Sequence, residues 1–275
     1  MTVKRVCAAV GLSRQAHYRA RRRRRRREID EGAVIELVKR ERRLQPKIGG
    51  RKLLTLLRRE WEEDLCIRMG RDRFFELLGQ HGLLIERRRR GAPRTTDARH
   101  GFRTYPNLFR DGTWSGAHQA WVSDVTYVRT NEGWLYAWLI SDVWSRKIVG
   151  YSGEESLQAE GSLRALEMAL SQLPSGALPL HHSDRGIQYC CRAYIRRLED
   201  RGLGVSMTEE NHCYENGQAE RVNGILKQEY GLGETFRTKA QAREALQQAV
   251  WLFNTRRPHT SLGYRIPAQV HETAA

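Results

Sequence analysis

Residues 121–140 read WVSDVTYVRTNEGWLYAWLI, two stretches rich in β-branched and aromatic residues separated by the triplet Asn131-Glu132-Gly133. Such stretches favour strands, and a short polar connection containing glycine joins them as a hairpin. A third stretch of this kind follows at residues 146–151. The sequence therefore predicts a sheet that begins near residue 120 with three consecutive strands.

After this meander the chain alternates between helical and strand-like segments. The pattern predicts, in order, a helix at 155–172, a strand at 178–180, a helix at 190–201, a strand at 203–205 and a helix at 215–230. The resulting order, βββαβαβα, fits a mixed sheet with helices on both faces. We therefore expect an α/β domain over residues 118–232, completed by a C-terminal helix and tail at residues 233–275.

The region before this domain has the apolar spacing of short helices. Residues 4–20 place small and apolar residues around a turn at Gly11, and Ser13 can cap a second helix. This pattern fits a short helix-turn-helix or a plain two-helix hairpin. Further helices are predicted at residues 31–43, 51–61 and 71–78. We expect a first unit at residues 1–27, a helical, helix-turn-helix-like domain at 28–90 and a basic linker at 91–117.

Positive charge is concentrated in this N-terminal region. The chain has a formal net charge of +16; residues 1–110 hold 31 Lys/Arg against 13 Asp/Glu, and the remainder holds 17 against 19. A run of seven arginines repels itself and finds its best partner in a phosphate backbone, although phosphate contacts do not read base sequence. We therefore predict double-stranded DNA as a partner, contacted by Arg14, Arg21, Arg22, Arg23, Arg24, Arg25, Arg26, Arg27, Arg87, Arg88, Arg89 and Arg90.

Membrane and secreted disulfide-rich proteins are disfavoured. The apolar content is 40%, and no apolar run is long enough to cross a bilayer. The N-terminus lacks the apolar segment of a signal peptide, and the five cysteines form neither a C-x-x-C pair nor a disulfide framework. We expect a cytoplasmic protein with reduced thiols and no membrane partner.

Three acidic residues stand at positions typical of an active site. Asp124 lies in the middle of the first strand among apolar and β-branched neighbours, where a charge is costly without a partner. Asp184 directly follows an apolar strand, at the edge where α/β sheets bind ligands. Glu220 lies near the start of the last predicted helix, and Asn223 and Lys227 share its face.

These acids indicate a site for divalent cations. Three carboxylates without a matching set of His or Cys ligands favour Mg²⁺ or Mn²⁺ over zinc. Two such ions can clamp an in-line phosphoryl transfer. His181 and His182, close to Asp184, leave two interpretations open, which are metal ligation and packing beside the site. The nearby cysteines have spacings that match no structural zinc pattern.

Three motifs resemble those of the integrase-core (DDE) insertion-sequence transposases. They are Trp121-x-x-Asp124-x-Thr126-Tyr127, His182-Ser183-Asp184-Arg185-Gly186-x-Gln188-Tyr189 and Cys213-Tyr214-Glu215-Asn216-Gly217-x-x-Glu220, with 35 residues between the second and third acids. Further matches are Ser145-Arg146-Lys147-Ile148-Val149-Gly150 and the tail Phe253-Asn254-x-x-Arg257-Pro258-His259. More closely, the chain resembles the second-reading-frame (OrfB) product of two-frame bacterial elements.

The resemblance implies a fold, a chemistry and partners. It implies a ribonuclease-H-like domain in which Asp124, Asp184 and Glu220 bind two Mg²⁺ or Mn²⁺ ions, hydrolyse the end of the element to free a 3′-OH and join that end to target DNA. It also implies that Lys227 contacts DNA near the cleaved end, with Asn223 and Arg185 as further candidates. The expected partners are the terminal inverted repeats, target DNA, further copies of the chain on DNA and an upstream first-frame protein fused by frameshifting.

The sequence departs from the family pattern at a few positions. Glu215 stands where Asp is usual, Gly217 where Ala is usual, and Cys190-Cys191 where small hydroxyl residues are common. None of these is one of the three acids, so the departures concern DNA-end preference. Two alternatives remain: a ribonuclease-H-fold nuclease, which has no use for the helical units, and a DNA-binding regulator, which has no use for the three acids.

Overall fold

The computed structural model describes residues 2–85, 101–209 and 213–273. The chain divides into two compact units, one made of residues 1–44 and 48–86 and the other of residues 45–47 and 87–275. In the described part of the chain, no helix is both long and apolar enough to cross a membrane.

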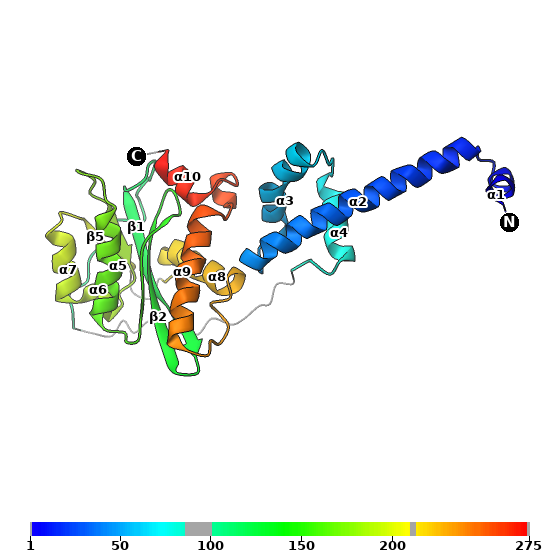
Figure 1. Cartoon of the computed structure of the whole chain (residues 1–275). Helices are drawn as coiled ribbons and strands as arrows, with labels where there is room; N and C mark the ends of the chain where they lie inside the picture. Colours follow the sequence, from blue (N-terminus) through cyan, green and yellow to red (C-terminus); the bar gives the residue numbers. More distant parts are fainter. Residues whose placement is uncertain (1, 86–100, 210–212, 274–275) are drawn as a thin grey trace. The chain divides into compact units, whose positions relative to one another are not determined.

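The N-terminal unit is helical (Figure 1). It contains α1 (Val3–Ala9), α2 (Arg14–Leu44), α3 (Gly50–Arg59), a π-helical turn (Glu60–Asp64) and α4 (Arg71–Gln80). Its core packs the second half of α2 against the shorter helices, through the buried side chains of Val34, Val38, Leu53, Trp61 and Phe74. Burial of this apolar surface is the main force that holds the unit together.

Helix α2 is longer than predicted. We expected a helix at residues 31–43, but α2 begins at Arg14 and includes the whole arginine run, so the boundary predicted between residues 27 and 28 falls inside one continuous helix. Arginine is a good helix former, and its side chains here extend into solvent. The repulsion is also reduced by ion pairs one turn apart, such as Arg24–Glu28 at 3.0 Å.

The connection between α1 and α2 agrees with its prediction. Gly11 makes the turn with a φ of +66°, a conformation that glycine adopts without strain. Ser13 Oγ accepts a hydrogen bond from the amide of Ala16 at 3.1 Å, which is the predicted cap of the second helix. Only Cys7 of α1 is buried, so this helix contributes little to a core.

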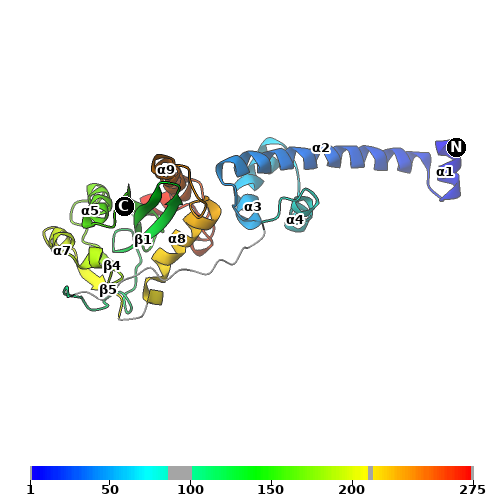
Figure 2. The ribbon, with the colours of Figure 1, turned by 90° about the horizontal axis from the view of Figure 1, so that it is seen from below.

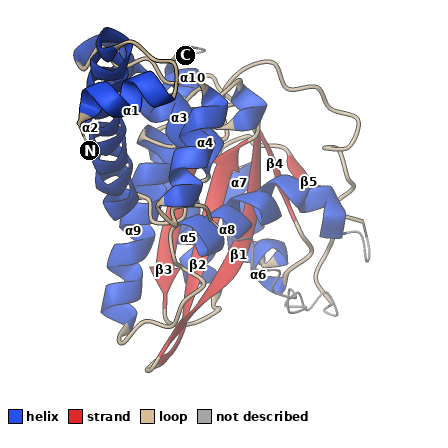
Figure 3. Ribbon diagram, turned by 90° about the vertical axis from the view of Figure 1, so that its right-hand side faces the viewer, coloured by secondary structure: helices blue, strands red, loops and turns tan. Residues whose placement is uncertain are grey.

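The second unit contains one five-stranded sheet, coloured red in Figure 3. Its strands are β1 (Ala120–Thr130), β2 (Gly133–Asp142), β3 (Ile148–Glu154), β4 (Leu180–Ser183) and β5 (Val205–Met207). They lie in the order β3-β2-β1-β4-β5, with β1–β2 and β2–β3 antiparallel and β1–β4 and β4–β5 parallel. The predicted mixed sheet is therefore confirmed.

Helices cover both faces of the sheet (Figure 2). One layer contains α5 (Ala159–Ser171), α6 (Ile187–Cys190) and α7 (Arg192–Glu199), and the other contains α8 (Gly217–Glu229) and α9 (Lys239–Thr255). Each layer has its own core, around Trp121 and Trp138 on the first face and around Val128 and Phe253 on the second. The predicted order βββαβαβα is present, except that the helix expected at 190–201 is interrupted at Cys191.

The C-terminal segment packs within this unit. After α9 the chain forms a 3-10 turn (Thr260–Leu262) and a last helix, α10 (Pro267–Glu272). The buried guanidinium of Arg257 makes two hydrogen bonds to the carboxylate of Glu229, at 2.8 and 2.9 Å, which connects the segment after α9 to the end of α8.

The described part of the predicted linker, residues 101–117, packs on the sheet domain. The Phe109 ring stacks on His182 with 4.7 Å between ring centroids, and the Leu108 amide donates to Ser206 Oγ at 3.0 Å. This stretch is thus part of the domain, because its aromatic and apolar side chains find buried positions there. Arg87–Arg90 lie outside the described residues.

Candidate active site

Asp124 lies on the face of β1 that α8 covers. Strand residues alternate between faces, and Val122 and Asp124 point to the α8 side while Trp121 and Ser123 point to the other. The Asn223 amide of α8 donates to Asp124 Oδ2 at 2.6 Å, and the Val125 backbone N–H donates to Oδ1 at 2.8 Å. Both contacts fix the direction of the carboxylate.

Asp184 follows the last residue of β4, the strand parallel to β1. Ser123 and Ser183 are paired in the register of these two strands, so Asp124 and Asp184 are the next residues along neighbouring strands. Strands in a sheet are about 4.8 Å apart, which brings the two residues close together. The Gly186 amide donates to Asp184 Oδ1 at 3.0 Å and closes a turn after the strand.

Negative charge and burial act together on Asp124. Burial is the larger cause and the charge of Asp184 the next, and together they raise the pKa of Asp124 to about 8. The hydrogen bonds from Val125 and Asn223 oppose this shift, and the charge of Glu220 adds a smaller upward contribution. All three predicted acids therefore share one electrostatic environment, in which Asp184 acts on Asp124 more strongly than Glu220 does.

Glu220 is on the first turn of α8, and its side chain is exposed. Among the residues that the structure describes, no group of three His, Cys, Asp or Glu side chains is placed so that it could hold a metal ion. Three carboxylates repel one another in the absence of cations. The convergence of Glu220 with the two aspartates thus stays a prediction.

Lys227 lies two turns after Glu220 on the same helix. Its side chain is half-buried, and burial lowers its pKa, while the charge of Asp124 acts in the opposite direction. Lys227 and Asn223 thus both face Asp124, as their shared helical face predicted. Asn223 is a direct hydrogen-bond partner of the acid, a role that the sequence alone did not assign to it.

His181 and His182 pack inside the sheet domain. His181 Nε2 is 2.7 Å from Ser123 Oγ and 2.8 Å from the Tyr194 hydroxyl, and burial lowers its pKa to about 3. His182 Nδ1 is 2.9 Å from Ser206 Oγ, and burial lowers its pKa to about 4. Of the two interpretations left open by the sequence, the structure favours packing beside the site.

The arginines predicted to bind DNA differ in their surroundings. Arg14 and Arg21–Arg27 are exposed on α2, and four of them help to line a hollow of about 720 Å³ in the N-terminal unit, together with Arg68 and Arg73. Arg185 Nε donates to the backbone oxygen of Thr208 at 2.7 Å, next to β5. The positions of these side chains are compatible with DNA contacts, which stay predictions.

A buried polar cluster near the end of β2 was not predicted from the sequence. Asp142 accepts hydrogen bonds from the amides of His118 and Ser145 and from Ser145 Oγ, and Ser145 Oγ also contacts His271 Nδ1 at 2.9 Å. The motif beginning at Ser145 was visible in the sequence. Its contact with a histidine 126 residues further along was not, because no local pattern encodes it.

Two integrase core domain models match the second unit, over residues 115–213 and 201–267. The chain is 35% identical to the insertion element IS600 uncharacterized 31 kDa protein of Shigella sonnei, with 97% of each chain covered. It is 34% identical to transposase InsF for insertion sequence IS3A of Escherichia coli (strain K12), over 70% of this chain and 67% of that one.

Solved integrase structures also align with the chain. The HTLV-2 integrase catalytic core domain, in complex with magnesium, has a TM-score of 0.46 and 18% identity over 57% of this chain and 97% of that one. A chain of the simian T-cell lymphotropic virus intasome in complex with PP2A regulatory subunit B56 gamma has a TM-score of 0.49 and 16% identity, over 74% of this chain and 67% of that one.

The mixed sheet, its two helical layers and the matching family models identify the second unit as a ribonuclease-H-like domain. A nuclease or a regulator, the two alternatives left by the sequence, would not be expected to match insertion-element proteins over so much of its length. The membership implies polynucleotidyl transfer on a DNA substrate. The chain belongs to the insertion-sequence transposases of the integrase-core (DDE) superfamily.

Proposed function

We propose that Asp124, Asp184 and Glu220 bind two divalent cations, Mg²⁺ or Mn²⁺, and that this site cleaves the ends of an insertion element and joins them to target DNA. The observation that carries the proposal is the state of Asp124. A carboxylate that is buried beside a second carboxylate is strongly disfavoured as an anion, which is the meaning of its raised pKa.

The side chains present fit such cations. Carboxylate oxygens are the ligands that Mg²⁺ and Mn²⁺ prefer, and Asp124 and Asp184 are neighbours on adjacent strands. The raised pKa of Asp124 means that the pair of aspartates retains a proton at higher pH than a free carboxyl group does in the cation-free protein. Cation binding must therefore displace this proton, so we expect the affinity for cations to rise with pH.

Bound cations would activate the attacking oxygen and stabilise the leaving oxygen of the phosphodiester. The residues of the chain prepare the site for this chemistry. Asn223 and the Val125 amide hold the Asp124 carboxylate in one orientation, which lowers the reorganisation needed when ligands bind. Lys227, half-buried beside the same acid, supplies a positive charge where a DNA phosphate would approach.

DNA binding is divided between the two units in this proposal. The exposed arginines of α2 contact the phosphate backbone, while the sheet domain positions the bond that is cut. Cleaving and joining two element ends requires two sites, so we propose that further copies of the chain assemble on DNA. In this proposal an upstream first-frame protein, fused by frameshifting, recognises the terminal repeats. Because the substrate is DNA, we also propose that the enzyme acts in the bacterial cytoplasm.

The test is cleavage and joining of a terminal element fragment in Mg²⁺. We expect Asp124→Asn, Asp184→Asn and Glu220→Gln each to abolish both steps with little change in DNA affinity, because each variant removes one anionic ligand. Glu244→Gln is the matched control, since this glutamate is exposed on α9. Near-normal cleavage by any of the three variants would exclude the assigned site. Cleavage without joining by the wild-type chain would indicate a nuclease.

A further inference from the structure

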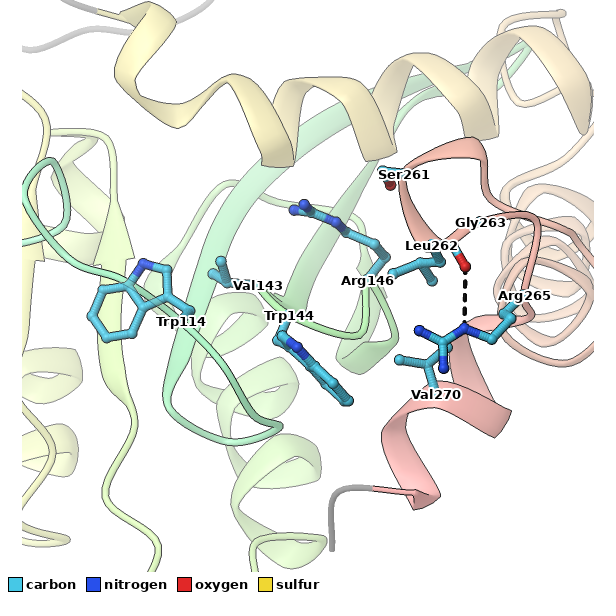
Figure 4. A pocket seen from close by; sticks show the side chains of 9 residues that line it. All are labelled: Trp114, Val143, Trp144, Arg146, Ser261, Leu262, Gly263, Arg265 and Val270. Atoms are coloured by element: carbon cyan, nitrogen blue, oxygen red, sulfur yellow. Dashed lines mark hydrogen bonds between the residues drawn. The ribbon is translucent and has the colours of Figure 1, made fainter.

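The sheet domain has a hollow that is lined by none of the three predicted acids. It has a volume of about 540 Å³ and lies between the connection that joins β2 to β3 and the segment that follows α9 (Figure 4). None of its lining residues is an Asp or a Glu; they are Trp114, Val143, Trp144, Arg146, Ser261, Leu262, Gly263, Arg265 and Val270. The hollow is therefore positively charged.

Its two arginines have no carboxylate within ion-pair distance in the described part of the chain. Arg146 is half-buried, and its Nε is buried without a hydrogen-bond partner. Arg265 is exposed, and its Nε donates to the backbone oxygen of Leu262 at 3.2 Å (Figure 4). Burial of the Arg146 guanidinium is costly, and the charge of Asp142, which lies beyond ion-pair distance, opposes this cost without being the larger effect. The arrangement therefore favours an anionic ligand.

The backbone around the hollow is held in an unusual conformation. Arg146 has a φ of +65°, and Tyr264, which lies in the chain between the lining residues Gly263 and Arg265, has a φ of +66°. This region costs a non-glycine residue about 1–2 kcal/mol. Such strain persists only where the surrounding structure fixes it, and it concentrates at functional sites. Of the four described non-glycine residues with positive φ, one thus lines this hollow and a second is the chain neighbour of two lining residues.

The buried cluster around Asp142 holds Arg146 in place. Asp142 Oδ1 accepts from the amide and from the hydroxyl of Ser145, both at 2.7 Å, and the Ser145 hydroxyl contacts His271 of α10. Arg146 is the next residue in the chain, and its amide donates to the backbone oxygen of Asp142 at 3.0 Å, so the cluster fixes the backbone position of Arg146. A fixed backbone limits where the guanidinium can lie before a ligand arrives, which reduces the entropy lost on binding.

The hollow is also connected to the helix that carries Glu220. Gln218, on the first turn of α8, donates a hydrogen bond to the backbone oxygen of Asp142 at 3.2 Å. Gln218 is two residues before Glu220, and Asp142 is four residues before Arg146. A polymeric ligand that contacts the first turn of α8 can thus extend to the hollow, whereas a small anion would gain nothing from this proximity.

We propose that the hollow binds a phosphodiester group of the DNA substrate at a distance from the bond that is cut, with Arg146 and Arg265 as its ligands. This inference rests on the proposed function, because it assumes DNA across α8. The planar guanidinium matches the geometry of phosphate oxygens. Trp144 and Leu262 form an apolar wall that excludes part of the water, which strengthens the attraction between the charges.

The test is DNA binding by the full chain in EDTA, where no cleavage occurs. For Arg146→Gln with Arg265→Gln we expect about tenfold weaker binding of a terminal duplex at ~0.15 M salt, and a salt slope lower by about 1.8 for two lost phosphate contacts. Arg146→Lys keeps the charge but not the planar guanidinium, so it should keep the salt slope of the wild type and lose only part of the affinity. Arg196→Gln, an exposed arginine on α7, is the matched control and should bind like the wild type.

Unchanged affinity and salt slope in the double variant would overturn the proposal. If Arg146→Gln prevents folding, the single variant Arg265→Gln tests the proposal, since Arg265 is exposed. Its replacement should lower the salt slope of DNA binding by about 0.9. A calorimetric titration with inorganic phosphate tests the other source of the same chemistry. Phosphate binding that needs Arg146, together with unchanged DNA affinity, would identify a free-phosphate site and also overturn the proposal.

The DNA-binding test of the hollow and the cleavage test of the acidic site give independent results. Loss of DNA affinity in the double variant supports the hollow even if Asp124→Asn still cleaves DNA, a result that would exclude only the acidic site. Conversely, unchanged binding by the double variant would exclude the hollow while leaving the cleavage assays of the acid variants fully interpretable.

Discussion

Asp124 is surrounded by groups with opposing effects on its charge. Burial and Asp184 disfavour the carboxylate anion, while the Val125 amide and Asn223 favour it. The net effect raises the pKa of Asp124 well above that of an aspartate in water. A residue in this state responds strongly to any cation, because a nearby positive charge stabilises the carboxylate anion and so opposes both causes of its raised pKa.

The first prediction concerns stability against pH in EDTA. The folded chain holds a proton on Asp124 up to a pH of about 8, whereas the unfolded chain releases it near the ordinary value of 3.8. This contribution to stability is complete below the ordinary value and is lost as the pH rises through 8. We therefore expect the thermal midpoint in EDTA to fall between about pH 7 and about pH 8, above the range in which the buried His181 and His182 make stability rise with pH. The midpoint should fall much less in Asp124→Asn.

A parallel pH series with Mg²⁺ provides the control, because a bound cation replaces the proton and should restore stability at high pH. Equal pH dependence of the wild type and Asp124→Asn in EDTA would show that Asp124 ionises normally.

The second prediction concerns Asn223. Its hydrogen bond lowers the pKa of Asp124, so Asn223→Ala should move the rise of cleavage activity with pH toward higher pH by about one unit. A structural defect would lower the rate at all pH values without moving the profile. Gln228→Ala, exposed on the same helix, is the control, and an unmoved profile in Asn223→Ala would contradict the role given to this residue.

At the scale of secondary structure, the sequence predicted most of the sheet domain. The three meandering strands were visible because aromatic and β-branched residues lie on both sides of a short polar turn, and their order with the later helices is confirmed. The full length of α2 was missed, because seven like charges were interpreted as a boundary. Propensity and solvent exposure outweighed the repulsion.

The candidate site was predictable only in part. The two aspartates follow from strand positions, and the shared face of Asn223 and Lys227 follows from helical periodicity. The hydrogen bond between Asn223 and Asp124 joins residues 99 positions apart, so it depends on how α8 packs on β1. No local pattern reports such packing, and the same holds for the contact between Ser145 and His271.

The third prediction concerns the ion pair that joins the end of α8 to the segment after α9. Arg257 is 2% exposed and Glu229 17%, so Arg257→Leu leaves a carboxylate with little access to water. We expect a loss of about 3–5 kcal/mol in the free energy of unfolding. The exposed pair Arg164–Glu154 is the matched control, and Arg164→Leu should cost less than about 1 kcal/mol. Urea denaturation measures both, and similar losses would contradict the argument.

On the scale of the whole chain, charge is divided unequally. Residues 1–110 carry 31 Lys/Arg against 13 Asp/Glu, while the remainder carries 17 against 19. The N-terminal unit should thus supply most of the attraction to DNA, and the sheet domain most of the chemistry. Long-range attraction of this kind raises the rate of encounter with DNA and weakens with salt.

The fourth prediction tests this division. Arg22, Arg23, Arg26 and Arg27 line one hollow, and their joint replacement by Gln keeps helix propensity while it removes four charges. We expect the salt slope of binding to fall by up to about 3.6, with little change in base preference. Replacing the exposed arginines Arg192, Arg196 and Arg201 by Gln is the control. If the quadruple variant keeps the salt slope of the wild type, the arginines of α2 do not supply the main contacts with the DNA phosphates.

The continuity of α2 has a consequence for the speed and selectivity of binding. The arginines predicted to bind DNA, Arg14 and Arg21–Arg27, lie on the first 14 residues of this 31-residue helix, a stretch of about 21 Å or the length of about six base pairs. They are therefore displayed at fixed intervals along a rigid rod. A disordered arginine tail can mould itself to any polyanion, whereas a rod fits only partners whose phosphates lie along a matching path. The chain should therefore discriminate straight duplex DNA from flexible polyanions by shape, without reading a single base.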